Sequence, residues 1–465
     1  MKSIEYLIDI LGDFIEEPKL ILVAGHPGSG KTTLASSICL YALKNNEKCL
    51  YVSFQEDKEK LFKQLEGVGI DFKAYDEKNS LKFVKIPVVA SSNDIQLTLD
   101  ILSKLVLEHS PRVVVVDSVT PLLETVESNA IARGYLQNFF WELQKTVGGA
   151  VVLVSEIPLG REYASMGWIE FVADAVLILK HRIRSGLIER ILEIRKVRGK
   201  QLTVSELHFS IISGKGIIIH RPVHLETYCS PILSKRLPVF KDKDVDVVEV
   251  SSPSITMYFE YPPETSPWVP IVFSILIHMV EKNPKILFID FSICPTSLTL
   301  GLMQMLKNYG ADSETITKIL RRIVFRTINP SAYSLSELIS YIISLIDDVK
   351  PTALYIHNDA IAWMSATEDP KEYTRILNNF VFELRARGVD IFRISSFVDP
   401  IFSNINKILS SYVVTMRCTD IACSSYTISI EKSQKVAGIT LSLENLEEIT
   451  RKLIQLVKNL YKQEV

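Results

Sequence analysis

The stretch LILVAGHPGSGKTT, residues 20–33, joins an aliphatic run to a glycine-rich loop and then to a helical pattern. Strand, loop and helix in this order form the context that a GxxxxGK[ST] phosphate-binding motif requires. Successive backbone N–H groups of such a loop converge on an anion, and the next helix directs its positive N-terminal end there. The stretch therefore predicts a triphosphate site. We expect the site to comprise Gly25, His26, Pro27, Gly28, Ser29, Gly30, Lys31, Thr32 and Thr33.

Three side chains are expected to supply the charge chemistry of this site. Lys31 provides a mobile cation for the β- and γ-phosphates, and the Thr32 hydroxyl is a ligand for Mg²⁺. The second metal ligand or water anchor in such sites is a carboxylate that ends a buried strand, and Asp117 closes the run VVVVD. The sequence therefore predicts ATP and Mg²⁺ as cofactors, with Thr32 and Asp117 at the metal.

The segments around this motif alternate short β-branched runs with amphipathic helical stretches. Runs that are apolar throughout, such as RVVVVDSV, are typical of parallel strands covered by helices on both faces. Farther along, DAVLILKHRI and ERILEIRKV are typical of a β-hairpin, with Ser185 and Gly186 in its turn. The first half is thus predicted to be an α/β domain with a mainly parallel sheet that ends in a β-hairpin.

The second half repeats this order at an almost constant offset. Lys48 matches Lys285, Pro111 matches Pro351 and Lys196 matches Lys435, which gives offsets of 237, 240 and 239 residues by subtraction. The pattern loosens between Pro222 and Pro253, where prolines and a charge cluster predict the junction. We therefore expect two tandem domains of the same fold, residues 1–226 and 227–465.

The amino-acid composition narrows the possible binding partners and the expected cellular location. The chain is 47% hydrophobic and 23% charged, with a net charge of −2 and a pI of about 6.5. This balance gives no overall attraction to nucleic acid or to anionic membranes. No apolar run approaches the roughly 20 residues of a membrane span, and the acidic N-terminus does not resemble a signal peptide. We expect a cytoplasmic protein whose six scattered cysteines are reduced and mostly in the core.

The second half lacks the phosphate-binding chemistry. Its loop reads EYPPETSPW, from Glu260 to Trp268, without a lysine or a glycine array. Adjacent prolines remove backbone donors, so this loop cannot form a nest of N–H groups. His357 stands in place of Asp117, and Ala437 in KVAG is aligned with Arg198 in KVRG. A retained fold with a lost nucleotide site is predicted.

Hydrolysis also needs a group that activates the attacking water. A carboxylate at the end of the strand next to the phosphate-loop strand is well placed, and KCLYVSF runs into Gln55 and Glu56. We expect Glu56 to be the water-activating residue. The alternative is a solvated acid at a helix start, favoured by the helix dipole.

Several stretches together identify a family resemblance. VSFQEDKEKL, DSVTPLL, VSEIP, EFVADAVLIL and KVRG, spread over nearly all of residues 1–222, resemble the KaiC-like ATPases of the RecA superfamily, of the archaeal type. The resemblance implies two tandem RecA-like domains and a homo-hexameric ring with ATP between subunits. Lys196 and Arg198 match the family's cationic pair that reaches the neighbour's γ-phosphate. The family usually has two adjacent glutamates where this chain has Gln55 and Glu56, which implies slow hydrolysis.

The same resemblance bears on self-phosphorylation. Some two-domain members phosphorylate adjacent Ser or Thr residues, at positions that correspond here to Glu170 and Phe171 and to Lys407 and Ile408. None of these can accept phosphate, although Ser410 and Ser411 lie nearby in the sequence.

The leading hypothesis is a regulatory ATPase whose nucleotide state controls ring assembly and the binding of a signalling or transcriptional protein partner. One alternative is a DNA-associated RecA-like accessory ATPase, in which the basic hairpin would contact DNA. It is disfavoured by the neutral net charge. The other alternative is an autokinase, or a pseudo-ATPase scaffold that binds ATP with negligible hydrolysis.

Overall fold

A computed structural model describes most of the chain. The described ranges are 2–87, 92–126, 130–158, 169–184, 187–200, 202, 205–220, 232–241, 244–252, 254–281, 284–366, 369–420, 426–432 and 435–463. The chain divides into two compact units, Met1–Arg221 and Pro222–Val465. The expected turn at Ser185 and Gly186 and the expected boundary at 226 fall outside the described residues. No helix within the described ranges is long and apolar enough to cross a membrane.

Unit 1 is built on a nine-stranded sheet in the order β3-β2-β4-β5-β1-β6-β7-β8-β9. The strands from β3 to β6 in this order are parallel, and β7, β8 and β9 continue the sheet in antiparallel fashion. The predicted hairpin is therefore present, as β6 and β7. The strands are β1 (Lys19–Gly25), β2 (Cys49–Ser53), β3 (Leu81–Lys85), β4 (Val113–Asp117), β5 (Ala150–Glu156), β6 (Ala175–Arg184), β7 (Leu187–Val197), β8 (Glu206–Ile212) and β9 (Gly216–Ile219).

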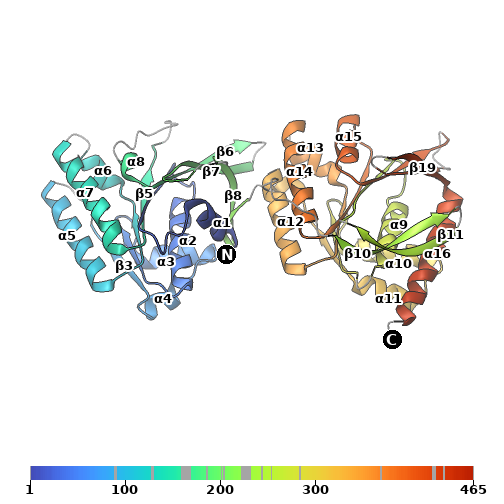
Figure 1. Cartoon of the computed structure of the whole chain (residues 1–465), viewed down its shortest axis with the longest axis horizontal. Helices are drawn as coiled ribbons and strands as arrows, with labels where there is room; N and C mark the ends of the chain where they lie inside the picture. Colours follow the sequence, from blue (N-terminus) through green and yellow to red (C-terminus); the bar gives the residue numbers. More distant parts are fainter. Residues whose placement is uncertain are drawn as a thin grey trace. The chain divides into compact units, whose positions relative to one another are not determined.

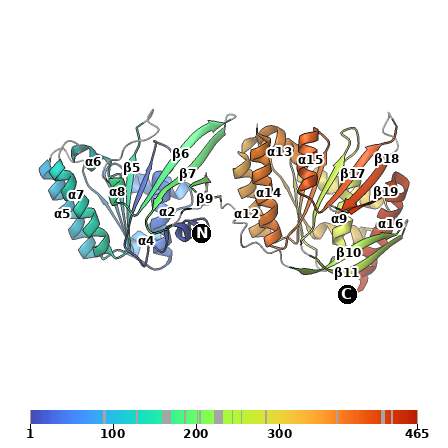
Figure 2. The same cartoon turned by 45° about the horizontal axis from the view of Figure 1, so that its top comes forward.

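Helices cover both faces of this sheet (Figures 1 and 2). Along β1, Ile21 and Val23 join the core on the side of α1 to α3, whereas Leu20 and Leu22 join the core on the side of α5 to α8. Burial on both faces explains why the strands are apolar throughout. The helices are α1 (Lys2–Leu11), α2 (Lys31–Lys44), α3 (Lys58–Gly67), α4 (Lys73–Glu77), α5 (Ser92–His109), α6 (Thr120–Val126), α7 (Ala130–Val147) and α8 (Ile169–Val172).

Unit 2 repeats this plan with an eight-stranded sheet in the order β14-β13-β15-β16-β12-β17-β18-β19. Its strands match the first eight of unit 1 one for one, which confirms two tandem α/β domains of RecA-like topology. The strands are β12 (Thr256–Tyr261), β13 (Ile286–Asp290), β14 (Ile323–Thr327), β15 (Ala353–His357), β16 (Asp390–Ser396), β17 (Tyr412–Cys418), β18 (Tyr426–Lys432) and β19 (Lys435–Ser442).

The sheet of unit 2 is also covered on both faces (Figure 2). The cores on its two sides draw on α9, α10, α11 and α16, and on α12 to α15. The helices are α9 (Trp268–Met279), α10 (Pro295–Asn308), α11 (Ser313–Arg321), η2 (Pro330–Ala332), α12 (Leu335–Val349), α13 (Asp359–Ala366), α14 (Pro370–Ala386), α15 (Pro400–Ile408) and α16 (Leu443–Gln463).

The strand register corrects one predicted correspondence between the halves. Lys196 lies on β7 and pairs with Val176, and the matching position of unit 2 is Glu431 on β18, which pairs with Val413. Lys435 and Ala437 instead lie on β19, one strand farther along. The alignment of KVRG with KVAG is therefore wrong. The hairpin of unit 2 is shorter, so a constant residue offset aligns Lys196 with Lys435 on β19, beyond the matching strand β18.

The segment expected to be an irregular junction contains a second hairpin. β10 (Leu233–Lys241) and β11 (Asp244–Ser252) pair in antiparallel fashion as a separate two-stranded sheet of unit 2. Lys235 on β10 forms a buried ion pair with Asp390 at the start of β16, which holds the hairpin on the domain. The segment between Pro222 and Pro253 thus contains regular structure in spite of its prolines and charges, and the alternation in DVDVVEV is the sequence signal for β11.

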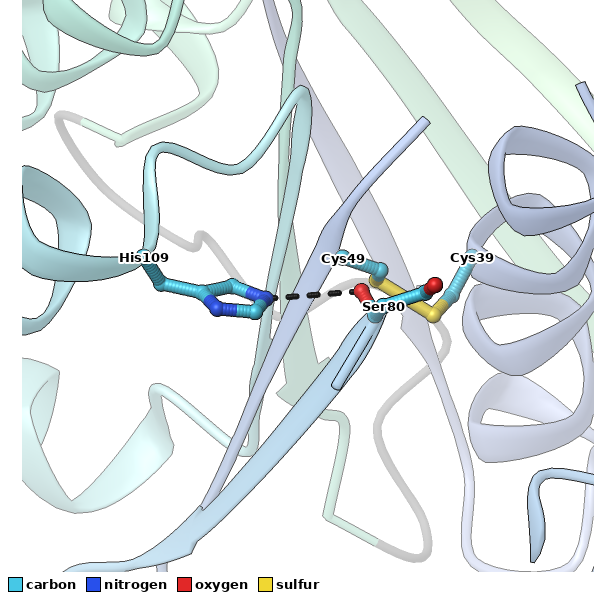
Figure 3. Close-up of a disulfide and its surroundings, with 4 residues drawn as sticks. All are labelled: Cys39, Cys49, Ser80 and His109. Atoms are coloured by element: carbon cyan, nitrogen blue, oxygen red, sulfur yellow. Dashed lines mark hydrogen bonds between the residues drawn. A yellow bond between two sulfur atoms is a disulfide. The ribbon is translucent and has the colours of Figure 1, made fainter. Parts of the chain in front are cut away.

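The expectation of reduced cysteines is wrong for Cys39, Cys49 and Cys418. Cys39 on α2 and Cys49 at the start of β2 form a disulfide, with Cα atoms 6.0 Å apart (Figure 3). Both cysteines are fully buried, and Cys418 is disulfide-bonded as well. Cys294 is free and exposed. Sequence spacing did not predict the first bond because the packing of helix against strand brings the two residues together.

Candidate nucleotide site

The loop after β1 has the backbone of a phosphate cradle. Gly25 is the last residue of β1, and its carbonyl accepts a hydrogen bond from the Ile157 N–H at 3.0 Å. Gly28 and Gly30 have φ values of 76° and 101°, a left-handed backbone that other residues rarely adopt. Gly30 is the N-cap of α2, which begins at Lys31. The loop therefore directs the helix N-terminus to the carboxyl edge of the sheet, where ligands bind in open α/β folds.

The Lys31 side chain lies within the cradle. Its Nζ donates a hydrogen bond to the His26 carbonyl at 3.0 Å, and the residue is 8% exposed. Burial lowers the pKa of the Lys31 ammonium, while the charges of Glu156 and Asp117 act to raise it. The loop carbonyl and these two acids therefore stabilise the ammonium.

The two expected metal ligands lie together. Asp117, at the end of β4, accepts hydrogen bonds from the Tyr51 hydroxyl at 2.8 Å and from the Thr32 side chain. Burial raises the pKa of the Asp117 carboxyl, and the donors Tyr51 and Thr32 and the nearby Lys31 act against that rise. The structure thus brings a hydroxyl and a carboxylate side by side, as magnesium bound to a triphosphate requires.

The remaining polar groups also fit a triphosphate with magnesium. The Ser29 hydroxyl is fully buried in the loop and has no hydrogen-bond partner among the described residues. Within the described ranges no group of three or more His, Cys, Asp or Glu side chains could hold a metal ion by itself. A magnesium ion here would need phosphate oxygens as further ligands, as is usual for Mg²⁺. When bound, it would neutralise charge developing on the phosphates.

The ring of His26 lies beside a backbone carbonyl of its own chain. Its Nδ1 lies 3.1 Å from the Ile157 carbonyl, the residue after β5. Pro27 and Gly28 are exposed at the loop tip. His26 thus lies in the loop as expected, with its ring nitrogen beside a backbone carbonyl.

Glu56 lies just beyond β2, between that strand and α3. Its N–H donates to the Ser53 hydroxyl at 2.9 Å, and its carboxylate pairs with Lys60 one helical turn onward at 2.8 Å. The side chain is 34% exposed. The expectation that Glu56 follows the strand next to the phosphate-loop strand is wrong, because β4 and β5 lie between β2 and β1 in the sheet. The carboxylate lies just beyond the carboxyl end of β2, and a lysine of its own chain neutralises it.

Lys196 and Arg198 contact their own chain, away from its phosphate loop. Lys196 Nζ donates to the carbonyls of Glu170 and Phe171 at 3.0 and 3.1 Å. Arg198 donates to the Asp174 carboxylate at 3.0 Å and to the Phe171 carbonyl at 3.2 Å. Both cations thus bind around the C-terminal end of α8, where the helix dipole favours positive charge.

The strand register shows how far these cations lie from the loop. Lys196 pairs with Val176, which pairs with Leu22, three residues before Gly25. Three strand residues correspond to about 10 Å, and β7 is two strands from β1 in the sheet.

Glu156 is an acid at this edge that the sequence analysis did not assign. It ends β5, pairs with Gly25 across the sheet, and acts electrostatically on Lys31. The sequence contains a signal for this acid, because Glu156 ends the buried run AVVLVSE in the same way that Asp117 ends VVVVD.

Comparison with known proteins agrees with this geometry. Residues 2–224 match the family model described as the KaiC ATPase. These residues are a KaiC-family ATPase domain. The match spans unit 1, which contains the cradle, Lys31, Thr32 and Asp117.

Relatives of the KaiC-family domain include clock proteins and a shorter archaeal protein. The circadian clock protein KaiC3 of Synechocystis sp. is 26% identical over 205 residues, 43% of this chain and 41% of the relative. A UPF0273 protein of Pyrococcus horikoshii is 27% identical over 225 residues, 46% of this chain and 90% of the relative. The clock oscillator protein KaiC of Synechococcus elongatus is 25% identical over 206 residues, 44% of this chain and 39% of the relative. The matched region therefore spans about two-fifths of the clock relatives.

Proposed function

We propose that this protein is an ATPase of a homo-hexameric ring in which Mg·ATP binds to unit 1 between adjacent subunits. Lys31 and the loop N–H groups hold the phosphates, Thr32 and Asp117 hold the magnesium ion, and Glu56 activates water. The nucleotide state sets ring assembly and thereby the binding of a regulatory protein partner in the cytoplasm. Two relatives are named for the circadian clock, which supports a regulatory role.

The position of Lys196 and Arg198 carries the proposal of a shared site. Both cations are held near α8, well short of the phosphate loop of their own chain. A cation that stabilises charge developing on the γ-phosphate has to approach it closely. The pair therefore acts on the nucleotide of a neighbouring copy, and hydrolysis depends on assembly.

A mixing experiment tests this arrangement. Lys31→Met should lose Mg·ATP binding, and Arg198→Ala should bind Mg·ATP but lose turnover by about 10³-fold. Mixed in equal amounts, the variants should regain activity, because about one interface in four then joins an intact loop to an intact Arg198. Turnover and mass in solution are measured with and without Mg·ATP.

Two matched variants serve as controls. Lys44→Met changes an exposed lysine at the other end of α2, and Lys200→Ala removes an exposed cation two residues beyond Arg198. Both should keep wild-type turnover. No recovery in the mixture, or a wild-type monomer that hydrolyses ATP at full rate, would overturn the shared site.

A further inference from the structure

The carboxyl edge of the unit 2 sheet has its own polar cluster where unit 1 has its nucleotide site. Asp290 and His357 end β13 and β15 and pair with each other across the sheet, as Ser53 and Asp117 do in unit 1. Tyr261 ends β12 and pairs with the last residue of β16, as Gly25 pairs with the last residue of β5. The three strand ends that surround a phosphate site in unit 1 thus carry a tyrosine, an aspartate and a histidine in unit 2.

Five hydrogen-bond contacts join these three residues and two neighbouring ones, Asn358 and Ser292, into a closed ring. His357 Nδ1 lies 2.6 Å from Asp290 Oδ2, and His357 Nε2 lies 2.9 Å from the Tyr261 hydroxyl. The Tyr261 hydroxyl lies 3.2 Å from Asn358 Oδ1, and Asn358 Nδ2 lies 2.7 Å from the Ser292 hydroxyl. The Ser292 hydroxyl returns to Asp290 Oδ1 at 2.9 Å. We call these five residues the polar ring.

A count of hydrogens constrains the protonation of the polar ring. The Tyr261 hydroxyl donates to Asn358, the Asn358 amide to Ser292 and the Ser292 hydroxyl to Asp290, so each of the two contacts of His357 needs a hydrogen from His357 itself. A carboxylate supplies none, and a neutral imidazole, a tyrosine, a serine and one end of an asparagine amide supply one each. The total is four, whichever way the amide of Asn358 is turned.

We propose that Asp290 and His357 together hold one proton more than a carboxylate and a neutral imidazole carry, and that this proton completes the polar ring. The pair is then an imidazolium beside a carboxylate, with His357 donating from both nitrogens. Both side chains are fully buried, and Tyr261 is 4% exposed. A buried pair of opposite charges that is fully hydrogen-bonded avoids the cost of an isolated buried charge.

The surroundings of the pair are consistent with this charge state. Burial acts to raise the pKa of the Asp290 carboxyl, but the hydrogen bond and charge of His357 and the N–H groups of Ile293 and Ser292 outweigh burial and lower it. Burial raises the pKa of the Tyr261 hydroxyl, which therefore keeps its proton. Donation to Asp290 from two backbone N–H groups, each at 2.7 Å, stabilises the carboxylate form.

Other charged groups face the polar ring from neighbouring elements. Asp359, at the start of α13, is buried and acts on both His357 and Tyr261. Arg393 on β16 offsets the charge of Asp359. Glu260 on β12 is paired with Lys407 of α15 at 2.8 Å. Burial raises the pKa of the Asp359 carboxyl to about 6, against the charges of Arg393 and His357.

In unit 1 the strand ends enclose a cradle that a nucleotide can fill, whereas in unit 2 the side chains of the polar ring tie the strand ends directly to one another. The polar ring thus lies at the edge of unit 2 that corresponds to the nucleotide cradle of unit 1.

Nitrogen NMR on the full chain with ¹⁵N-labelled histidine tests the proton count. At neutral pH His357, assigned by its loss in His357→Gln, should show a proton on both ring nitrogens. In Tyr261→Phe three contacts remain for three hydrogens, so one nitrogen of His357 should lose its proton. Tyr355→Phe is the matched control, because that buried hydroxyl donates to the Ser274 carbonyl outside the polar ring. It should leave His357 doubly protonated.

A second variant tests the same proton count if Tyr261→Phe does not fold. Asn358 has a φ of 59°, which glycine adopts readily, so Asn358→Gly removes the amide without backbone strain. It also leaves three contacts for three hydrogens, and His357 should again lose one proton. An unprotonated nitrogen on wild-type His357, or a doubly protonated His357 in both variants, would overturn the proposal.

Discussion

Among single residues, Asp117 is the one that we propose to hold the magnesium ion through a carboxylate. It is the expected carboxylate ligand, and burial raises the pKa of that carboxyl against the hydrogen bonds from Tyr51 and Thr32. A protonated carboxyl is a poor ligand for a hard cation. As the pH falls, magnesium binding should therefore begin to weaken at a higher pH than it would at an exposed aspartate.

Tyr51→Phe should move this effect to still higher pH. Removing the 2.8 Å hydrogen bond takes away a donor that stabilises the Asp117 carboxylate, so the pKa of Asp117 rises further. Calorimetric titration with Mg·ATP between about pH 5 and pH 8 should show affinity lost at a higher pH in the variant than in wild type. Tyr41→Phe on α2 is a control and should follow wild type. Identical pH profiles for wild type and Tyr51→Phe would show that Tyr51 does not tune Asp117.

Glu56 is the residue that we propose to activate water, and its carboxylate pairs with Lys60 at 2.8 Å. If it activates water, Glu56→Gln should lower kcat by about 10²-fold or more while Mg·ATP still binds. Glu59→Gln, in the first turn of α3, should have no effect on kcat. Unchanged single-turnover hydrolysis in Glu56→Gln would remove Glu56 from the mechanism.

At the scale of elements, the disulfide joins the helix that follows the phosphate loop to a strand of the sheet. α2 starts at Lys31 and β2 ends at Ser53, beside Glu56, while Cys39 and Cys49 bond between them (Figure 3). The bond closes a loop with a sequence separation of 10 residues. Such a cross-link restricts the unfolded chain more than the folded one.

Cys39→Ser should therefore lower the free energy of unfolding of unit 1 by about 2–4 kcal/mol. Denaturant titration of the full chain, with and without a thiol reductant, measures the change. Reductant should destabilise unit 1 of wild type but not unit 1 of the variant, because the disulfide of Cys418 lies in unit 2 of both proteins. Cys294→Ser, at the free exposed cysteine, should leave stability unchanged. Equal stability of wild type with and without reductant would contradict this expectation.

At the scale of the whole molecule, one fold occurs twice with different chemistry at the same edge. Unit 1 presents a cradle with Lys31, and unit 2 presents the polar ring. A ligand that binds the native state stabilises it by RT ln(1 + [L]/Kd), about 2.7 kcal/mol when the ligand is at 100 times Kd. We propose that Mg·ATP exerts this effect on unit 1.

Hydrogen exchange on the full chain should therefore respond to Mg·ATP unevenly. Peptides that contain Gly25 to Lys31 and Asp117 should gain protection, while peptides that contain Asp290 and His357 should not. Lys31→Met should abolish the response in unit 1 and leave the exchange of unit 2 unchanged. Protection by Mg·ATP at Asp290 or His357 in the Lys31→Met variant would place a nucleotide in unit 2.

Much of the fold was predictable because its signals are local or periodic. The strand, loop and helix around GHPGSGKT are contiguous, so the cradle could be derived from residue types and spacing alone. Apolar runs at strand length predicted the parallel sheet, and their recurrence predicted a second copy. The absence of a lysine and a glycine array in EYPPETSPW predicted that the second edge differs.

Contacts between distant residues were decided by the tertiary structure. His357 is 67 residues from Asp290 and 96 from Tyr261, and no spacing rule connects them. The Cys39–Cys49 bond, and Glu431 as the counterpart of Lys196, likewise depend on which strand or helix lies beside which. The sequence thus determined what each edge could bind through its local backbone and charges. Only the packed sheet determined which side chains share hydrogens, because that depends on strand order and register.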